Sequence, residues 1–355
     1  MAQNFPGCHF LVCCEKGKEQ AIDDILSGIA SKSVFTPQSL ARALGMSGGR
    51  QENSIGHCRN LLQLASACAN PLLGMLMLDD DVLPTQQTRN AFLLSFPKYD
   101  LVQGAYSCET GNRIYALVRF FQTLEQGEKG KKLLDALCCE RIGAEPTAPG
   151  LHSLAGGLAG ISSRLLLKNA FAPTDYRFED HFFEFSSRFL FPSMNYMGLQ
   201  TAEGEIPVAG HKRAGARNHS ALVDGFVGQV RASIVESYFY HCLSGCVPRL
   251  VGGQHKLVRS PSFDGAAEAK HAFDACAVGK LSSAAKFHLK DFPSGEVGAQ
   301  LSRLALLSLD DISVPLQELE AEWAAFQEER EWLSGAADAC RKGGKRILAD
   351  AGWAD

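Results

Sequence analysis

Three consecutive carboxylates follow a short apolar run in the first third of the chain. The run 72–78 has seven residues and ends at Asp79, Asp80 and Asp81. A run of this length suits a strand that is buried on both faces of a parallel sheet. Unpaired acids cannot continue into the core, so they must lie at the C-terminal end of that strand, where open α/β sheets bind ligands. Their oxygens suit a divalent cation such as Mg²⁺ or Mn²⁺.

A second pair of acids, Glu179 and Asp180, lies about 100 residues downstream at the start of the aromatic segment 176–185. The spacing predicts a helix that these acids open. Acids in a first helical turn are favoured by the helix dipole, so a capping role explains them. A carboxylate at the mouth of a pocket is also suited to act as a general base. The sequence leaves both interpretations open.

Two further segments add groups that bind anions or metals. Gly156 and Gly157, with Gly160 close behind, either form ordinary turns or let the backbone approach a ligand. The segment from His211 to Arg213 is basic. Its side chains either are solvated or supply a metal ligand and a contact to a diphosphate.

The elements that must position these residues alternate between strand and helix in the first half. This alternation predicts an α/β fold with a mostly parallel twisted sheet flanked by helices. One segment, 112–124, fits either a strand or a helix. The predicted strands are 9–14, 33–35, 72–78 and 101–106, and the predicted helices are 22–29 and 55–69.

Three common nucleotide or hydrolase motifs are absent. The segment 127–131 has neither the spacing nor the hydroxyl residue of a P-loop. No G-x-G-x-x-G follows the first strand, and no G-x-S-x-G occurs. These absences argue against P-loop ATPases, dinucleotide-binding domains and α/β-hydrolases.

In their order along the chain, these segments resemble GT-A-fold glycosyltransferases of the large family 2 type. In that family an Arg-Asn pair precedes a D-x-D strand, and a glycine loop, a Glu-Asp pair and a histidine follow it. The resemblance covers roughly residues 8–220. The matching residues are Arg59-Asn60, which lies 19 residues before Asp79, then Asp79–Asp81, Gly156-Gly157, Glu179-Asp180 and His211.

The resemblance implies a site for a nucleoside-diphosphate sugar and a divalent metal, Mn²⁺ or Mg²⁺. Asp81 would bind the metal together with Asp79 and His211. Glu15 would take the place of an acid that the family usually carries after its second strand. The implied donor-binding residues are Glu15, Arg59, Asn60, Asp79, Asp80, Gly156, Gly157 and Arg213.

The resemblance also implies a reaction. Asp180 would deprotonate the hydroxyl of the acceptor as it attacks the anomeric carbon, and Glu179 would contact the acceptor or hold Asp180 in position. Direct displacement would invert the anomeric configuration, although some enzymes with the GT-A fold retain it without an evident nucleophile. The chain lacks the tryptophan-rich motif of processive synthases, which favours a single transfer to a soluble small molecule or glycan precursor.

Composition limits the setting in which this reaction would occur. The net charge of −4 gives no sign of a nucleic-acid partner, and no apolar stretch approaches the roughly 20 residues of a membrane span. Residues 1–10 have neither a basic start nor an apolar core, so we expect no secretion signal. The twelve cysteines include no CxxC motif, which favours a reduced, cytoplasmic protein.

We expect a GT-A-like catalytic domain over residues 1–220 and a mainly helical region over residues 221–355. The helices of the second region would cover the acceptor side, pack against the sheet or form a homodimer interface. Their apolar residues recur at helical spacing. The predicted helices are 223–243, 266–277, 300–307 and 316–349.

Two other functions remain open on the sequence. A sugar nucleotidyltransferase has a related nucleotide-binding sheet, but residues 13–18 lack the G-x-G-x-R loop that normally follows its first strand. A catalytically silent protein that binds sugar nucleotides, with the C-terminal helices as its partner surface, would show the same binding residues without turnover.

Overall fold

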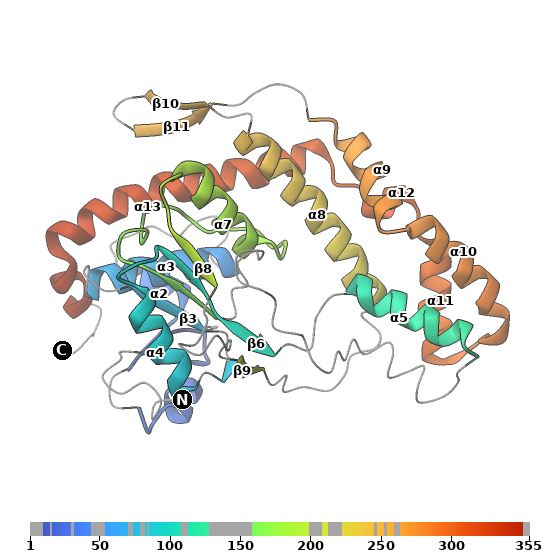
Figure 1. Ribbon diagram of the computed structural model, residues 1–355, viewed down its shortest axis with the longest axis horizontal. Helices are drawn as coiled ribbons and strands as arrows, with labels where there is room; N and C mark the ends of the chain where they lie inside the picture. The colour runs from blue at the N-terminus through green and yellow to red at the C-terminus, as the bar shows by residue number, and fades with distance from the viewer. Residues whose placement is uncertain are drawn as a thin grey trace.

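The computed structural model describes most of the chain between Phe10 and Asp350 (Figure 1). The described residues are 10–14, 16–29, 32–43, 54–69, 74–78, 82–83, 85–107, 113–127, 158–198, 208–211, 222–244, 247–251, 254–258 and 263–350. Within this part the fold is mixed α/β and mostly helical, with small sheets.

The strands are short. They are β1 (Phe10–Cys13), β2 (Lys32–Phe35), β3 (Met75–Leu78), β4 (Val82–Leu83), β5 (Leu101–Gln103), β6 (Ala105–Ser107), β7 (Leu158–Ile161), β8 (Tyr196–Gly198), β9 (Val208–His211), β10 (Val247–Val251) and β11 (Gln254–Val258).

The helices carry most of the described chain. They are α1 (Glu19–Ile25), α2 (Pro37–Ala43), α3 (Ile55–Ala69), α4 (Gln86–Ser95), α5 (Arg113–Glu125), α7 (Glu179–Leu190), α8 (Leu222–Ser244), α9 (Gly265–Ala275), α10 (Val278–His288), the 3₁₀ turn η3 (Leu289–Asp291), α11 (Gly295–Leu306), α12 (Leu309–Ile312) and α13 (Leu316–Asp350). None of the helices described is both long and apolar enough to cross a membrane.

Strand pairing differs from the predicted, mostly parallel sheet. The main sheet has the order β3-β7-β5-β8, and β7 is antiparallel to both of its neighbours. A second sheet has the order β4-β9-β6, in which β4 and β9 are antiparallel. Parallel pairing joins β1 to β2, β5 to β8 and β6 to β9. The predicted parallel pairing was wrong for β3, because its partner is the antiparallel strand β7. Local sequence patterns do not reveal a partner that lies 80 residues away in the chain.

The strand that precedes the three aspartates is buried on alternate residues. Met75 and Met77 are buried on the face that α3 and α7 cover, where they pack with Phe183. Leu76 and Leu78 are only partly buried, and they pack near Phe92 of α4 on the opposite face. The main sheet therefore lies between helices on both faces, although β3 is not completely buried as predicted.

Most of the long predicted helices are confirmed. The helix predicted over 55–69 is α3, and the ambiguous segment 112–124 is helical as α5. The strand predicted over 101–106 divides into β5 and β6 at Gly104, and each part joins a different sheet. The first half of the chain thus shows the predicted alternation in its described residues, within more fragmented sheets.

The largest hydrophobic core crosses the predicted boundary at residue 220. It combines buried residues of α3 and α7, such as Leu64 and Phe182, with Phe239 of α8 and Phe326 of α13. Figure 1 shows α13 as a long helix that runs past α3 and α8, and α13 and α3 are in extensive contact. The C-terminal helices therefore complete the core around α3.

One cysteine contradicts the expectation of a fully reduced protein. Cys68, which is buried near the end of α3, is disulfide-bonded. Cys13, Cys58 and Cys276, in contrast, are free thiols. Sequence spacing could not reveal this bond, because a disulfide joins residues that folding alone brings within reach.

Gly56, in the first turn of α3, packs closely against the backbone at Ala172. A Cβ atom on Gly56 would lie 1.9 Å from the backbone oxygen of Ala172, whereas one on Gly335 of α13 would meet nothing within 4 Å. We predict that Gly56→Ala lowers the free energy of unfolding by about 1–3 kcal/mol, because rigid backbone must move. Gly335→Ala should raise it by about 0.5–1 kcal/mol.

Denaturant titration of both variants measures these changes. Equal effects in the two variants would contradict the close contact between α3 and the segment around Ala172.

Candidate functional site

An arginine from α3 joins the two acids that open α7. The Arg59 Nη1 atom lies 3.0 Å from Glu179 Oε1, and the same nitrogen also contacts Asp180. Arg59 and Glu179 are separated by 120 residues in sequence. The side chains of Arg59 and Glu179 are 11% and 8% exposed, and that of Asp180 is 21% exposed. This acid cluster (Arg59, Glu179 and Asp180) thus combines predicted residues from two distant segments.

Aromatic packing fixes the position of the acid cluster. The Arg59 guanidinium lies over the ring of Phe171, 5.5 Å from its centroid. Phe171 stacks on Phe183 of α7 with ring centroids 4.0 Å apart and planes at 11°. Helix α7 begins at Glu179, which confirms the predicted helix start. Glu179 and Asp180 therefore lie in its first turn, where the helix dipole favours negative charge.

A buried polar network lies next to the acid cluster along α3. Glu329 of α13 accepts a hydrogen bond from Asn60 Nδ2 at 3.0 Å, and its Oε1 lies 2.8 Å from His57 Nδ1. Asn60 Nδ2 also donates a hydrogen bond to the carbonyl oxygen of Phe171 at 2.9 Å, and Asn60 Oδ1 accepts one from the Phe171 N–H at 2.8 Å. His57, Asn60 and Glu329 are all buried.

Asn60 is more deeply buried than Arg59. It is completely buried, and every contact described for it is with another residue of the core. Its predicted role as a donor contact stays a prediction, since the internal bonds alone account for an amide at this position. The sequence analysis missed His57 and Glu329, because nothing in the pattern of α13 distinguishes a buried glutamate from its solvated neighbours.

Strand register brings the remaining predicted segments together at their backbones. Leu78, which directly precedes Asp79, pairs with Leu158, which directly follows Gly157. Val82, which directly follows Asp81, pairs with His211. Antiparallel partners have Cα atoms about 4.5–5.5 Å apart. The last described residue before the three aspartates therefore lies opposite the first residue of β7, and the first described residue after them lies opposite the last residue of β9.

Several predicted site residues lie outside the described part of the chain. They are Glu15, Asp79, Asp80, Asp81, Gly156, Gly157, Arg213 and the side chain of His211. Among the side chains that are described, no group of three or more His, Cys, Asp or Glu residues is arranged to hold a metal ion. This absence does not concern the predicted metal ligands, because the side chains of Asp79, Asp81 and His211 lie outside the described part of the chain.

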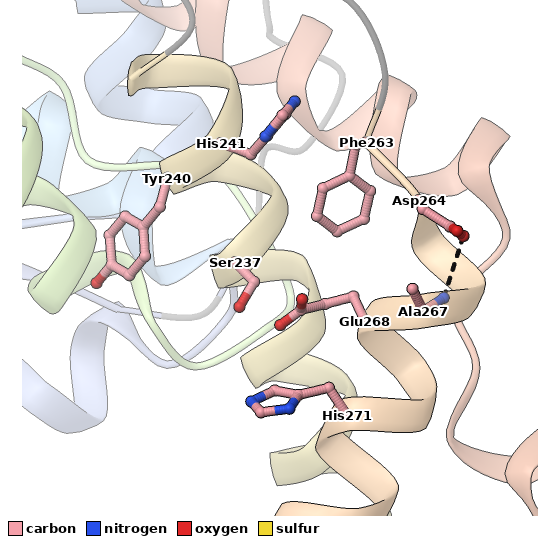
Figure 2. A pocket seen from close by; sticks show the side chains of 8 residues that line it. All are labelled: Ser237, Tyr240, His241, Phe263, Asp264, Ala267, Glu268 and His271. Atoms are coloured by element: carbon pink, nitrogen blue, oxygen red, sulfur yellow. Dashed lines mark hydrogen bonds between the residues drawn. The ribbon is translucent and has the colours of Figure 1, made fainter.

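A separate depression of about 540 Å³ lies between α8 and α9 (Figure 2). Tyr240 and His241 line it from α8, and Glu268 and His271 line it from α9. Asp264 also lines it but caps α9, accepting hydrogen bonds at 3.1 Å from the N–H groups of Ala266 and Ala267. None of the site residues predicted from the sequence lines this depression.

No protein-family model matches the chain, and no curated protein sequence matches it significantly. Any function must therefore be argued from the chain's own residues and their geometry.

The buried network makes a direct prediction about stability. Asn60→Ala should lower the free energy of unfolding by about 2–5 kcal/mol, because it leaves the N–H and C=O groups of Phe171 buried without their partner. Asn90→Ala, on the exposed side of α4, is the matched control and should change it by less than about 0.5 kcal/mol. Urea unfolding of both variants measures the difference, and similar values would contradict the clamp on Phe171.

Proposed function

We propose that this chain is a metal-dependent glycosyltransferase with a GT-A-type fold. It would move a sugar from a nucleoside-diphosphate donor to a hydroxyl of a soluble acceptor, with inversion at the anomeric carbon. The observation that carries the proposal is the register of β3 with β7 and of β4 with β9. It joins the segments on either side of Asp79–Asp81 to those next to Gly157 and at His211.

This register supports one site for the diphosphate and its metal. Carboxylates and an imidazole are suitable ligands for Mn²⁺, and carboxylates with water suit Mg²⁺. Asp79, Asp81 and His211 would hold the ion. When bound, it would act as a Lewis acid that compensates charge developing on the departing diphosphate. The glycine pair before β7 would let backbone N–H groups approach the phosphates without a side chain in the way.

The acid cluster supports the assignment of Asp180 as the base. Of its two carboxylates, Asp180 is the more exposed and is therefore the better placed to meet an acceptor hydroxyl. Arg59 compensates the negative charge that a base must carry before it accepts a proton. Glu179 is buried, and through its hydrogen bond with Arg59 it would fix the guanidinium on which Asp180 depends.

The acceptor would approach from the Asp180 side of the helix start. The oxygen of its hydroxyl attacks the anomeric carbon as Asp180 takes the proton, and the bond from that carbon to the diphosphate breaks. Because attack and departure occur on opposite faces of the sugar, the product has the inverted configuration. A positioned general base typically contributes 10²- to 10⁴-fold to the rate.

Asp180→Asn is the direct test of the base. The amide retains the size of the carboxylate and can still accept a hydrogen bond from Arg59, but it cannot take a proton. We expect kcat for sugar transfer to fall by about 10²- to 10⁴-fold with little change in donor affinity. Turnover with nucleotide-sugar donors and calorimetric titration of the donor measure the two effects.

Asp274→Asn is the matched control, since Asp274 lies on the surface of α9 in an exposed pair with Lys270. It should leave both quantities unchanged. Transfer by the Asp180→Asn variant at the rate of the unaltered protein would rule out the base. Release of diphosphate from a nucleoside triphosphate and a sugar phosphate would indicate a nucleotidyltransferase instead.

The metal assignment predicts a binding effect that is independent of turnover. A nucleotide sugar at 100 times its Kd, with Mn²⁺ present, should stabilise the protein by about 2.7 kcal/mol. The resulting rise in Tm should be much smaller without the metal. His211→Ala should reduce the metal-dependent part, whereas His288→Ala, at the end of α10, should not.

Thermal scans across donors with uridine, guanosine and thymidine bases measure this effect. A donor-induced rise in Tm that is identical with and without divalent metal would exclude the proposed metal site.

A further inference from the structure

The depression between α8 and α9 is a candidate binding site in its own right (Figure 2). Its volume of about 540 Å³ lies within the range of pockets that hold small molecules. Most of the residues that line it are polar, although they lie where two helices pack against each other. They are Ser237, Tyr240 and His241 from α8, Phe263 and Asp264 just before α9, and Ala267, Glu268 and His271 from α9. The proposed transfer reaction uses none of them.

Several of these polar side chains have no partner within the described part of the chain. Ser237, Glu268 and His271 form no side-chain hydrogen bond or ion pair with another described residue. The Nε2 atom of His241 is buried, and it too lacks a hydrogen-bond partner there. Figure 2 shows Ser237, Glu268 and His271 pointing into the gap between the two helices. Because a buried polar atom without a partner is costly, these groups suit a ligand that supplies the missing bonds.

The charges of the lining residues select the kind of ligand. Asp264 and Glu268 supply two carboxylates, and no lysine or arginine is among the described residues that line the depression. The two carboxylates outweigh the roughly half positive charge that the start of α9 contributes. A phosphate or another anion would therefore be repelled. A metal ion is also disfavoured, because no group of three or more described His, Cys, Asp or Glu side chains is arranged to hold one.

We propose that the depression binds a small organic amine, with a primary ammonium group on an apolar stem. An ammonium group donates three hydrogen bonds and accepts none. The Glu268 carboxylate accepts one of them with the added attraction of opposite charges. The hydroxyl of Ser237 and the imidazole of His271 offer further acceptors. The proposal does not depend on the glycosyltransferase assignment, because it uses no residue of that site.

Two aromatic residues give the apolar stem a fixed surface. The ring of Phe263 lies 5.0 Å from that of the buried Tyr238, edge to face, and 5.4 Å from the ring of His241. Phe263 is therefore anchored to the largest core while it lines the depression. The hydroxyl of Tyr240 donates a hydrogen bond to Glu236, which holds the second ring in place. Aromatic rings held in this way pack against methylene groups, and their faces attract cations.

Saturation-transfer NMR with the full-length protein tests the proposal directly. The probes are 2-phenylethylamine and putrescine, and 2-phenylethanol and 1,4-butanediol are the matched neutral compounds in which a hydroxyl replaces each ammonium group. We expect each amine to bind with a Kd on the order of tenfold lower than that of its alcohol, because the alcohol carries no charge to meet Glu268. Equal affinity within each pair, no binding of either amine, or tighter binding of glucose than of the amines would overturn the proposal.

The Glu268→Gln variant tests the charge that would hold the ammonium group. It retains the size of the side chain, and we expect the Kd of both amines to rise on the order of tenfold. Glu296→Gln is the matched control, since Glu296 is exposed and also lies in the first turn of a helix, α11. Its Kd values should equal those of the unaltered protein. Equal losses in the two variants would show that the amines follow the overall charge of the protein and would refute the role of Glu268.

The Ala267→Leu variant fills the depression without changing any polar group. Ala267 is exposed and lines the depression, so the larger side chain should raise the Kd of 2-phenylethylamine at least several-fold. Ala266→Leu is the control, because Ala266 is the neighbouring exposed residue of α9 and does not line the depression. Circular dichroism verifies that both variants are folded. Unchanged binding by Ala267→Leu would place the amine elsewhere on the protein and overturn the proposal.

Discussion

The buried carboxylate of Glu329 is the constraint on which the described structure depends. Burying an ionised group is costly unless partners compensate it, and a partner that is lost leaves the charge exposed to an apolar surrounding. Here His57 and Asn60 of α3 are those partners. Because Asn60 also binds the backbone of Phe171, one carboxylate connects α13, α3 and the segment that leads into α7.

That connection determines where the acid cluster lies. Arg59 is next to Asn60 on α3, and its guanidinium packs on the ring of the residue whose backbone Asn60 holds. The first turn of α7 then meets Arg59 through Glu179 and Asp180. The acid cluster is thus positioned by a network in the core, and such positioning is what the proposed catalysis by an oriented base would require.

The sequence predicted the elements better than their partners. Periodicity located α3 from end to end and the start of α7, because a helix depends on local spacing. The antiparallel position of β7 depends on contacts with β3 and β5, which local patterns do not encode. The hairpin of β10 and β11 was missed, although Gly252-Gly253 is a typical turn sequence. In the site, residue types indicated Glu179 and Asp180, whereas the buried role of Glu329 depends on a contact across 269 residues.

The late position of Glu329 in the chain has a consequence for biosynthesis. His57 precedes its carboxylate partner by 272 residues. At a ribosomal rate of about 5–20 residues per second, α3 would wait roughly 15–55 s for α13 to be made. During that interval the apolar face of α3, including Leu61 and Leu64, has no helix α13 to cover it. Until α13 is made, nascent chains therefore carry an uncovered apolar surface of the kind that makes partly folded chains prone to aggregate.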